Sequence, residues 1–346
     1  MNYFFHIANP ILTFLVISIN IFPQTGTWIE NEDGTRVYKT FYDNGNIKDI
    51  RHYDKNTRLN GSWIEYDENG EKLEVLNYRD DKKDGEQYEY SEGLLVAGSI
   101  YKEGEVVSSY YYYSNGNKRW ETEYENGLRG ESSKSIYYYE NGQKSSETYF
   151  KNLEIEKKIY YHENGQKSSE TYNKNGHNEK RIQYHKNGQK LSELNFKDGK
   201  LEGKYLIWYE DGKKKTESYF KNDKLEGKAI TWYQNGQKNT ETYYKNGEWE
   251  GKAITWYQNG QKSVESYYKY GESNGKIMAW YENGNIKTEG QLIKDKKEGK
   301  WVYWYPNKRK KSEENYRNGE LHGRCIEWDE YGYKTSDKIF DNGYEK

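Results

Sequence analysis

The chain has 346 residues with 54 basic and 56 acidic side chains, and its net charge of −2 removes any global electrostatic basis for binding nucleic acid or an anionic membrane. Only 33% of the residues are hydrophobic while 17% are aromatic, which excludes both an alanine- and leucine-rich helical protein and an aromatic-poor disordered chain. The single cysteine, Cys325, excludes an intramolecular disulfide and a multi-cysteine zinc or iron–sulfur site.

The first segment, residues 1–23, differs from the rest of the chain. Between Tyr3 and Phe22 there is no Lys, Arg, Asp or Glu, although 32% of the whole chain is charged. An apolar run of this kind is typical of a signal peptide or an uncleaved N-terminal anchor. It predicts an exported protein, located in the periplasm, on the cell surface or outside the cell, that meets a membrane only through this segment if the segment is retained. A cytoplasmic protein is the alternative if the leader interpretation is wrong.

After the first segment the sequence repeats, with a period that settles at 24 residues. Asn-Gly recurs between aromatic-rich runs and predicts a β-hairpin, because both residues tolerate positive φ. Residues 25–105 hold irregular repeats that form a candidate cap, and residues 106–346 hold the regular array. The turn glycine of each repeat, replaced once by a lysine, stands at Gly45, Gly70, Gly93, Gly116, Gly142, Gly165, Gly188, Gly212, Gly236, Gly260, Gly284, Lys308 and Gly332.

Alternation with a period of two predicts that a strand lies on each side of the turn. An aliphatic position six residues before the turn glycine and an aromatic position four residues before it share one face of a strand, which we expect to be the buried face. A second aromatic position, eight residues after the glycine, is expected to join the same layer if a bulge at the turn brings it into phase. The predicted core includes Ile230, Trp232, Ile254, Trp256, Trp280 and Trp304.

A second glycine-bearing loop joins each hairpin to the next, as in residues 197–203. The predicted fold is therefore all-β, an elongated antiparallel meander of about thirteen stacked β-hairpins of 23–26 residues each. Because one hairpin is marginal in water, stability is expected to come from stacking between neighbouring hairpins.

No arrangement of side chains supports catalysis, since a feature present in every repeat is architectural and a catalytic pair needs only one copy. A glutamate five residues after the glycine and a lysine two residues after it are predicted to form a solvated ladder of charge that deters edge pairing. His162 and His185 share a repeat position, but about 10 Å between adjacent repeats is too far for one metal ion. We therefore predict no enzyme activity, no catalytic residue, no cofactor and no metal site.

The repeated unit reads Trp/Tyr-Tyr-Glu/Gln-Asn-Gly-x-Lys-x-Ser/Thr-Glu, followed by Tyr-x-Lys-Asn-Gly-x-x-x-Gly. It resembles the bacterial variant of the MORN repeat, and in particular the repeats of YwqK-type proteins, over residues 25–346 and most specifically over residues 134–323. The resemblance implies an elongated sheet of hairpins that binds protein, without catalytic residues, in a toxin–antitoxin or immunity setting. Lipid contact is not carried over, because Ser/Thr-Glu-x-Tyr stands here in place of the Tyr-x-Gly-x-Trp stretch of eukaryotic MORN repeats.

A turn tyrosine three residues before the glycine is predicted to point away from the core. One interpretation is that these rings pack against one another in a thin sheet, and the other is that they form a binding stripe. The first functional hypothesis is a scaffold that binds another protein, for example a toxin, as an antitoxin, immunity or envelope-interaction component. The second is an exported protein that binds glycan or cell wall through its periodic aromatic side chains. The candidate stripe consists of Tyr139, Tyr209, Tyr233, Tyr257, Tyr281 and Tyr305.

Overall fold

The computed structural model describes residues 26–125 and 132–346, and the predicted leader, residues 1–23, lies outside the described residues. Within these ranges the chain forms strands and turns, and it divides into two compact units, one ending at Gly116 and the other beginning at Asn117. The described part of the chain contains no helix with the length and apolarity needed to cross a membrane. The division predicted after residue 105 marks a change in repeat regularity and stays a prediction.

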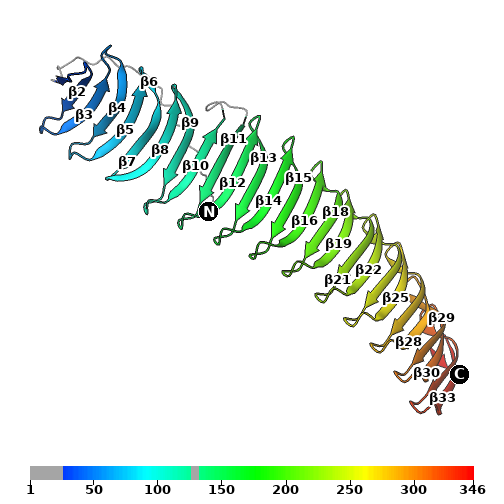
Figure 1. Cartoon of the computed structure of the whole chain (residues 1–346). Helices are drawn as coiled ribbons and strands as arrows, with labels where there is room; N and C mark the ends of the chain where they lie inside the picture. Colours follow the sequence, from blue (N-terminus) through cyan, green and yellow to red (C-terminus); the bar gives the residue numbers. More distant parts are fainter. Residues whose placement is uncertain (1–25, 126–131) are drawn as a thin grey trace. The chain divides into compact units, whose positions relative to one another are not determined.

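The first unit is an antiparallel meander in which each long strand pairs with the next (Figure 1). The two-residue strand β6 pairs only with the end of β5, so β5 and β7 are neighbours in the sheet. The strands are β1 (Thr27–Glu30), β2 (Arg36–Phe41), β3 (Ile47–Tyr53), β4 (Leu59–Tyr66), β5 (Lys72–Arg79), β6 (Lys82–Lys83), β7 (Gly85–Ser91), β8 (Leu94–Lys102) and β9 (Glu105–Tyr112).

The second unit continues the same pattern of antiparallel hairpins lying side by side (Figure 1). Its long strands are β10 (Lys118–Tyr124), β11 (Ser132–Tyr138), β12 (Lys144–Lys151), β13 (Glu154–Tyr161), β14 (Lys167–Lys174), β15 (His177–Tyr184), β16 (Lys190–Lys197), β18 (Gly203–Trp208), β19 (Lys214–Lys221), β21 (Gly227–Trp232), β22 (Lys238–Lys245), β24 (Gly251–Trp256), β25 (Lys262–Lys269), β27 (Gly275–Trp280), β28 (Ile286–Ile293), β29 (Lys296–Trp304), β30 (Lys310–Arg317), β32 (Gly323–Trp328) and β33 (Lys334–Asp341). Short strands follow the connecting turns at β17 (Lys200–Leu201), β20 (Lys224–Leu225), β23 (Glu248–Trp249), β26 (Glu272–Ser273), β31 (Glu320–Leu321) and β34 (Tyr344–Glu345).

These pairings confirm the predicted all-β meander of hairpin repeats. Consecutive repeats of the second unit also pair in the same register, so that equivalent residues of each hairpin face equivalent residues of the next. Two junctions one repeat apart illustrate this, with Thr216↔Thr231 and Glu217↔Ile230 at the first and Thr240↔Thr255 and Glu241↔Ile254 at the second.

The two kinds of turn differ in backbone conformation. In the Asn235–Gly236 turn only the glycine has a positive φ, of 89°, and the asparagine Nδ2 donates a hydrogen bond to the carbonyl of Gln258 in the next hairpin at 2.7 Å. Both residues have positive φ in the connecting turn instead, at Asn246 (52°) and Gly247 (90°). The expectation that both residues of the first turn adopt positive φ is therefore wrong, because the turn is longer than two residues: the Gly236 N–H donates to the carbonyl of Tyr233 at 2.9 Å, and the Asn235 Oδ1 accepts from the Gln237 N–H at 3.0 Å.

The second aromatic position lies on the face opposite the aliphatic position. Tyr244 pairs with Gly227, and Ile230 pairs with Glu241. Tyr244 and Glu241 are an odd number of residues apart on one strand, so their side chains point to opposite sides of the sheet. Ile230 lies on the side of Glu241, and Tyr244 therefore lies on the other side. A bulge does occur beside Trp232, but it lies between these two residue pairs and the turn. It therefore does not change which side of the sheet Tyr244 faces relative to Ile230. The expectation that the two aromatic positions share one layer is therefore wrong.

Both faces of the sheet bury side chains. We call the face with the aliphatic and aromatic positions the Ile–Trp face, and on it all six predicted core residues are half-buried. On the opposite face the small residues Ser218, Ala253 and Ser266 are buried. No large side chain in the described ranges is fully buried. The hydrophobic core is thus shared between the two surfaces of a single layer.

The first unit differs from the second at one position of the Ile–Trp face. Five residues after the turn glycine, where the regular repeats have glutamate, it has Ile50 and Val75. Both pair across the sheet with Ile64. Two of the irregular early repeats therefore keep the hairpin but carry an apolar side chain in place of a charged one, while the third has Gly98 at this position.

Deletion of residues 228–251 removes one repeat and joins Gly227 to Lys252. The new Gly-Lys junction is identical to the junctions at 227–228 and 251–252 of the native sequence. Because the register recurs from repeat to repeat, we expect this variant to fold with an unchanged circular dichroism signal per residue. Small-angle X-ray scattering is expected to show a second unit shorter by about 10 Å, which is two strand spacings.

The matched control removes one residue fewer, residues 228–250, and moves every later side chain of that strand to the other face. This variant is expected to lose its sheet signal or to aggregate. Equal behaviour of the two deletions would contradict the recurring register.

Candidate binding face

A glutamate clamp recurs on the Ile–Trp face of the second unit. The carboxylate of Glu241 accepts hydrogen bonds from the Nζ atoms of Lys228 at 2.8 Å and Lys238 at 2.7 Å. Its side chain is only 14% exposed, because Ile230 and Ile254 flank it on the neighbouring strands. The predicted solvated charge ladder is therefore wrong for the glutamates, although the lysines reach solvent. The same two-lysine clamp recurs at Glu193, Glu217, Glu265 and Glu313.

The clamp lysine after the turn also covers the tryptophan of the next repeat. The Nζ atom of Lys238 lies 5.4 Å from the ring centre of Trp256 while it holds Glu241. One side chain thus joins a carboxylate of its own repeat to an aromatic ring of the next. Equivalent pairs are Lys190 with Trp208, Lys214 with Trp232, Lys262 with Trp280 and Lys310 with Trp328.

Glu147 holds the clamp position of an earlier repeat, where the ammonium groups of Lys134 and Lys144 both approach its carboxylate. Its side chain is 5% exposed between Ile136 and Ile159. Burial alone would raise the pKa of this carboxyl group, but hydrogen bonds from Lys144 and Tyr149 and the lysine charges around it outweigh burial and lower the pKa to about 2.

This lowered pKa predicts an acid-sensitive contribution to stability. Glu147 stabilises the fold above its ordinary pKa of 4.5, and this contribution is lost as the pH falls toward 2. Over that window the change is roughly 3 kcal/mol, since each pKa unit corresponds to about 1.4 kcal/mol. Glu147→Gln is expected to lower the free energy of unfolding at pH 7 and to flatten its decline in acid, as measured by urea denaturation at a series of pH values. The exposed Glu163→Gln is the control, and equal slopes for both variants would contradict the clamp.

The six turn tyrosines of the candidate stripe all use their hydroxyl groups within the array. Tyr233 donates to the carbonyl oxygen of Trp256 in the next repeat at 2.8 Å. His185 fills the same place, with its Nε2 atom 3.2 Å from the carbonyl oxygen of Trp208. These groups serve the array, and a binding role for the turn tyrosines stays a prediction. The other five make the same bond at 2.7–3.0 Å, namely Tyr139, Tyr209, Tyr257, Tyr281 and Tyr305.

Tyr233→Phe removes this bond and leaves a half-buried carbonyl without its donor. We expect a loss of about 1 kcal/mol in the free energy of unfolding, measured by chemical denaturation. Tyr333→Phe changes a tyrosine that is 74% exposed, so it should alter stability little. A loss of equal size in both variants would show that the hydroxyl bond contributes nothing specific.

A different set of tyrosines is open to solvent on the Ile–Trp face. Tyr219, Tyr243 and Tyr267, which we call the exposed tyrosine row, are 42%, 39% and 38% exposed. The Nζ atom of Lys228 lies 5.8 Å from the ring centre of Tyr243, and that of Lys252 lies 6.0 Å from that of Tyr267. The row is not apparent in the amino-acid sequence, because another aromatic residue follows each member. Its signal is the constant 24-residue spacing.

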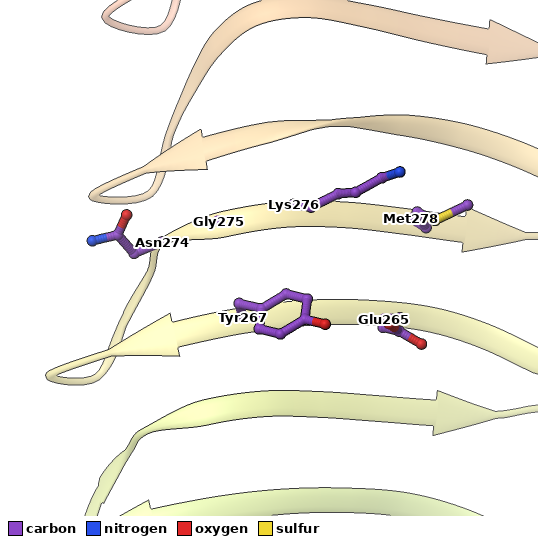
Figure 2. Close-up of a pocket in the computed structure, with 6 residues that line it drawn as sticks. All are labelled: Glu265, Tyr267, Asn274, Gly275, Lys276 and Met278. Carbon is purple, nitrogen blue, oxygen red and sulfur yellow. The ribbon is translucent and has the colours of Figure 1, made fainter.

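Two hollows of similar composition open beside this row, one repeat apart. In the hollow of Figure 2, Glu265 and Tyr267 come from β25, while the opposite wall comes from β27 and the turn before it. Each hollow combines a phenol ring, a carboxylate, an ammonium group, a glycine and an apolar side chain. Neither offers a metal cluster, since the described ranges contain no group of three or more His, Cys, Asp or Glu able to hold an ion. One hollow, of about 390 Å³, is lined by Glu265, Tyr267, Asn274, Gly275, Lys276 and Met278, and the other, of about 410 Å³, by Glu241, Tyr243, Glu250, Gly251, Lys252 and Ile254.

Comparison with known families identifies the repeat. Eight segments match the family described as the MORN repeat variant, at residues 37–55, 59–80, 134–152, 180–198, 201–222, 225–246, 249–270 and 297–318. These eight segments are MORN-variant repeats. Both units contain matched segments, and the two matches at 225–246 and 249–270 hold Tyr243 and Tyr267. The matched segments are thus repeats of a scaffold type, and the two hollows lie at equivalent positions one repeat apart. No curated protein matches the chain.

Proposed function

We propose that this chain is a non-enzymatic scaffold that binds another protein along the Ile–Trp face. The observation that carries the proposal is the exposed tyrosine row, with rings about 40% open to solvent at identical positions of three successive repeats. Tyrosine is enriched in protein interfaces because its ring offers a large contact area and its hydroxyl a hydrogen bond.

The charge of this face favours a partner without strong net charge. Glu265 is paired with Lys252 and Lys262 at 2.7 Å each, so much of the local charge is compensated within the sheet. A polyanion would have to displace such pairs to use the lysines. Identical weak sites that follow one another along the array instead favour an extended partner that engages several repeats at once.

The proposal extends to an exported protein of antitoxin, immunity or envelope-interaction type. Two sequence features support it, namely the resemblance to YwqK-type repeats and the apolar stretch from Tyr3 to Phe22. A toxin is one partner that this setting suggests. Glycan is the second candidate ligand, favoured by the open faces of the tyrosine rings, on which sugars can stack.

Site-specific crosslinking in the source cells tests the choice between these ligands. A photoreactive phenylalanine analogue placed at position 243 or 267 is expected to form a covalent adduct with a polypeptide, identified by mass spectrometry. Positions 331 and 333 are the controls, because their tyrosines are 68% and 74% exposed but lie in a turn away from the row. Adducts of equal yield at all four positions would contradict a binding role for the row. A protease-resistant adduct that contains sugar would favour glycan.

A further inference from the structure

Each hollow contains one glycine, on the wall opposite its tyrosine. Gly251 has no atom within 4 Å of the place where a Cβ would stand, so this space is open. At Gly275 a Cβ would approach the Cβ of Tyr267 to 3.0 Å. Both glycines also have positive φ, of 89° and 136°, which disfavours other residues. At Gly275 a side chain would thus press against the tyrosine of its own hollow, and at both positions the backbone conformation favours glycine, which keeps this wall free of a side chain.

The distance between hollows follows from the sheet itself. The hollow beside Tyr243 lies between β22 and β24, and the hollow beside Tyr267 lies between β25 and β27. Because β24 pairs with β25, the two hollows are separated by two strand spacings. At about 4.8 Å per strand, equivalent points of the two hollows are about 9.6 Å apart. The same residue types continue one repeat earlier, at Glu217, Tyr219, Gly227, Lys228 and Ile230. A ligand that lies along the array therefore needs a repeat close to this length.

Among peptide conformations, the polyproline II helix fits this spacing best. It advances about 9.3 Å in each three-residue turn, so every third residue points to the same side. A β-strand presents residues to one side every 6.6–6.8 Å or so, which is out of step with the hollows. An α-helix repeats its face about every 10.5 Å over seven residues and drifts by roughly 1 Å at each hollow.

The chemistry of the lining also suits this conformation. A polyproline II chain has no internal hydrogen bonds, and its prolines have no N–H groups, so its backbone offers only acceptors. The hollow of Figure 2 provides donors in the ammonium group of Lys276, which is 61% exposed and reaches Glu289 only at 3.6 Å, and in the amide of Asn274. In the other hollow Glu250 stands in place of Asn274, and the donor is the ammonium group of Lys252, which is 38% exposed and also holds Glu265 at 2.7 Å. Tyr267 supplies an aromatic wall of the kind on which proline-rich segments dock.

We propose that the Ile–Trp face of residues 203–280 binds a proline-rich segment in the polyproline II conformation. The segment runs across the strands and places one residue of every three in successive hollows. This inference rests on the proposed function and specifies its partner.

Titration of the full chain with a fluorescein-labelled proline dodecamer, followed by fluorescence polarisation, tests the proposal. Saturable binding is expected, with affinity that rises in steps as the peptide grows from three to six to nine residues and little further at twelve, because the face carries three tyrosine positions. A Gly-Ser dodecamer, which lacks the preformed conformation, is expected not to bind. The double variant Tyr243→Thr/Tyr267→Thr should bind the proline dodecamer about tenfold or more weakly, because two ring contacts are lost.

Threonine is chosen because it favours strands, so the variant should keep the fold, which circular dichroism will check. The control is Tyr331→Thr/Tyr333→Thr, which removes two exposed rings outside the row and should leave affinity unchanged. Absence of saturable binding, equal loss in both double variants, or tighter binding of a heptad-patterned helical peptide or a chitin oligomer would each overturn the inference. If crosslinking at positions 243 and 267 still yields a polypeptide adduct while the proline dodecamer does not bind, the proposed function stands and this inference fails.

Discussion

A sheet that is one layer thick has no second layer to cover its apolar side chains. The rest of this structure depends on how the sheet shields those side chains from water. The regular repeats cover the Ile–Trp face with long amphipathic side chains. Lys238 extends its stem over the ring of Trp256 and neutralises Glu241. Each clamp carboxylate thereby lies between two apolar side chains of the neighbouring strands, and its negative charge is compensated by lysine. A composition rich in Tyr, Trp, Lys and Glu but poor in aliphatic residues follows directly from this arrangement.

The sequence predicts the parts of the fold that depend on local signals. Glycine at a fixed spacing, aromatic runs and alternation with a period of two are sufficient to predict hairpins, because turn geometry and strand periodicity are properties of short segments. The Ile–Trp pair also shares a face as expected, since Ile230 and Trp232 are two residues apart on one strand. The MORN resemblance agrees with these local signals, and the eight matched segments are of the predicted kind.

What the sequence does not predict is set by contacts between hairpins. The placement of Tyr244 required the register of β21 against β22, and a bulge beside Trp232 makes that register impossible to count from the turn. The role of Asn235 required knowledge of the carbonyl in the next hairpin. The hydroxyl partners of the turn tyrosines could not be predicted for the same reason, because each partner is a carbonyl oxygen of the next repeat. The exposed tyrosine row becomes visible only once the two faces are assigned.

The hydrogen-bond direction within the second unit also has a mechanical consequence. Its strands lie across the direction in which repeats follow one another, so tension along that direction pulls neighbouring strands apart rather than sliding them past each other. Each junction carries a similar set of bonds, including the turn hydroxyl that reaches the next carbonyl. Under load such an array yields one hairpin at a time at similar forces. It therefore behaves as an extensible tether with many equivalent weak links and no single breaking point.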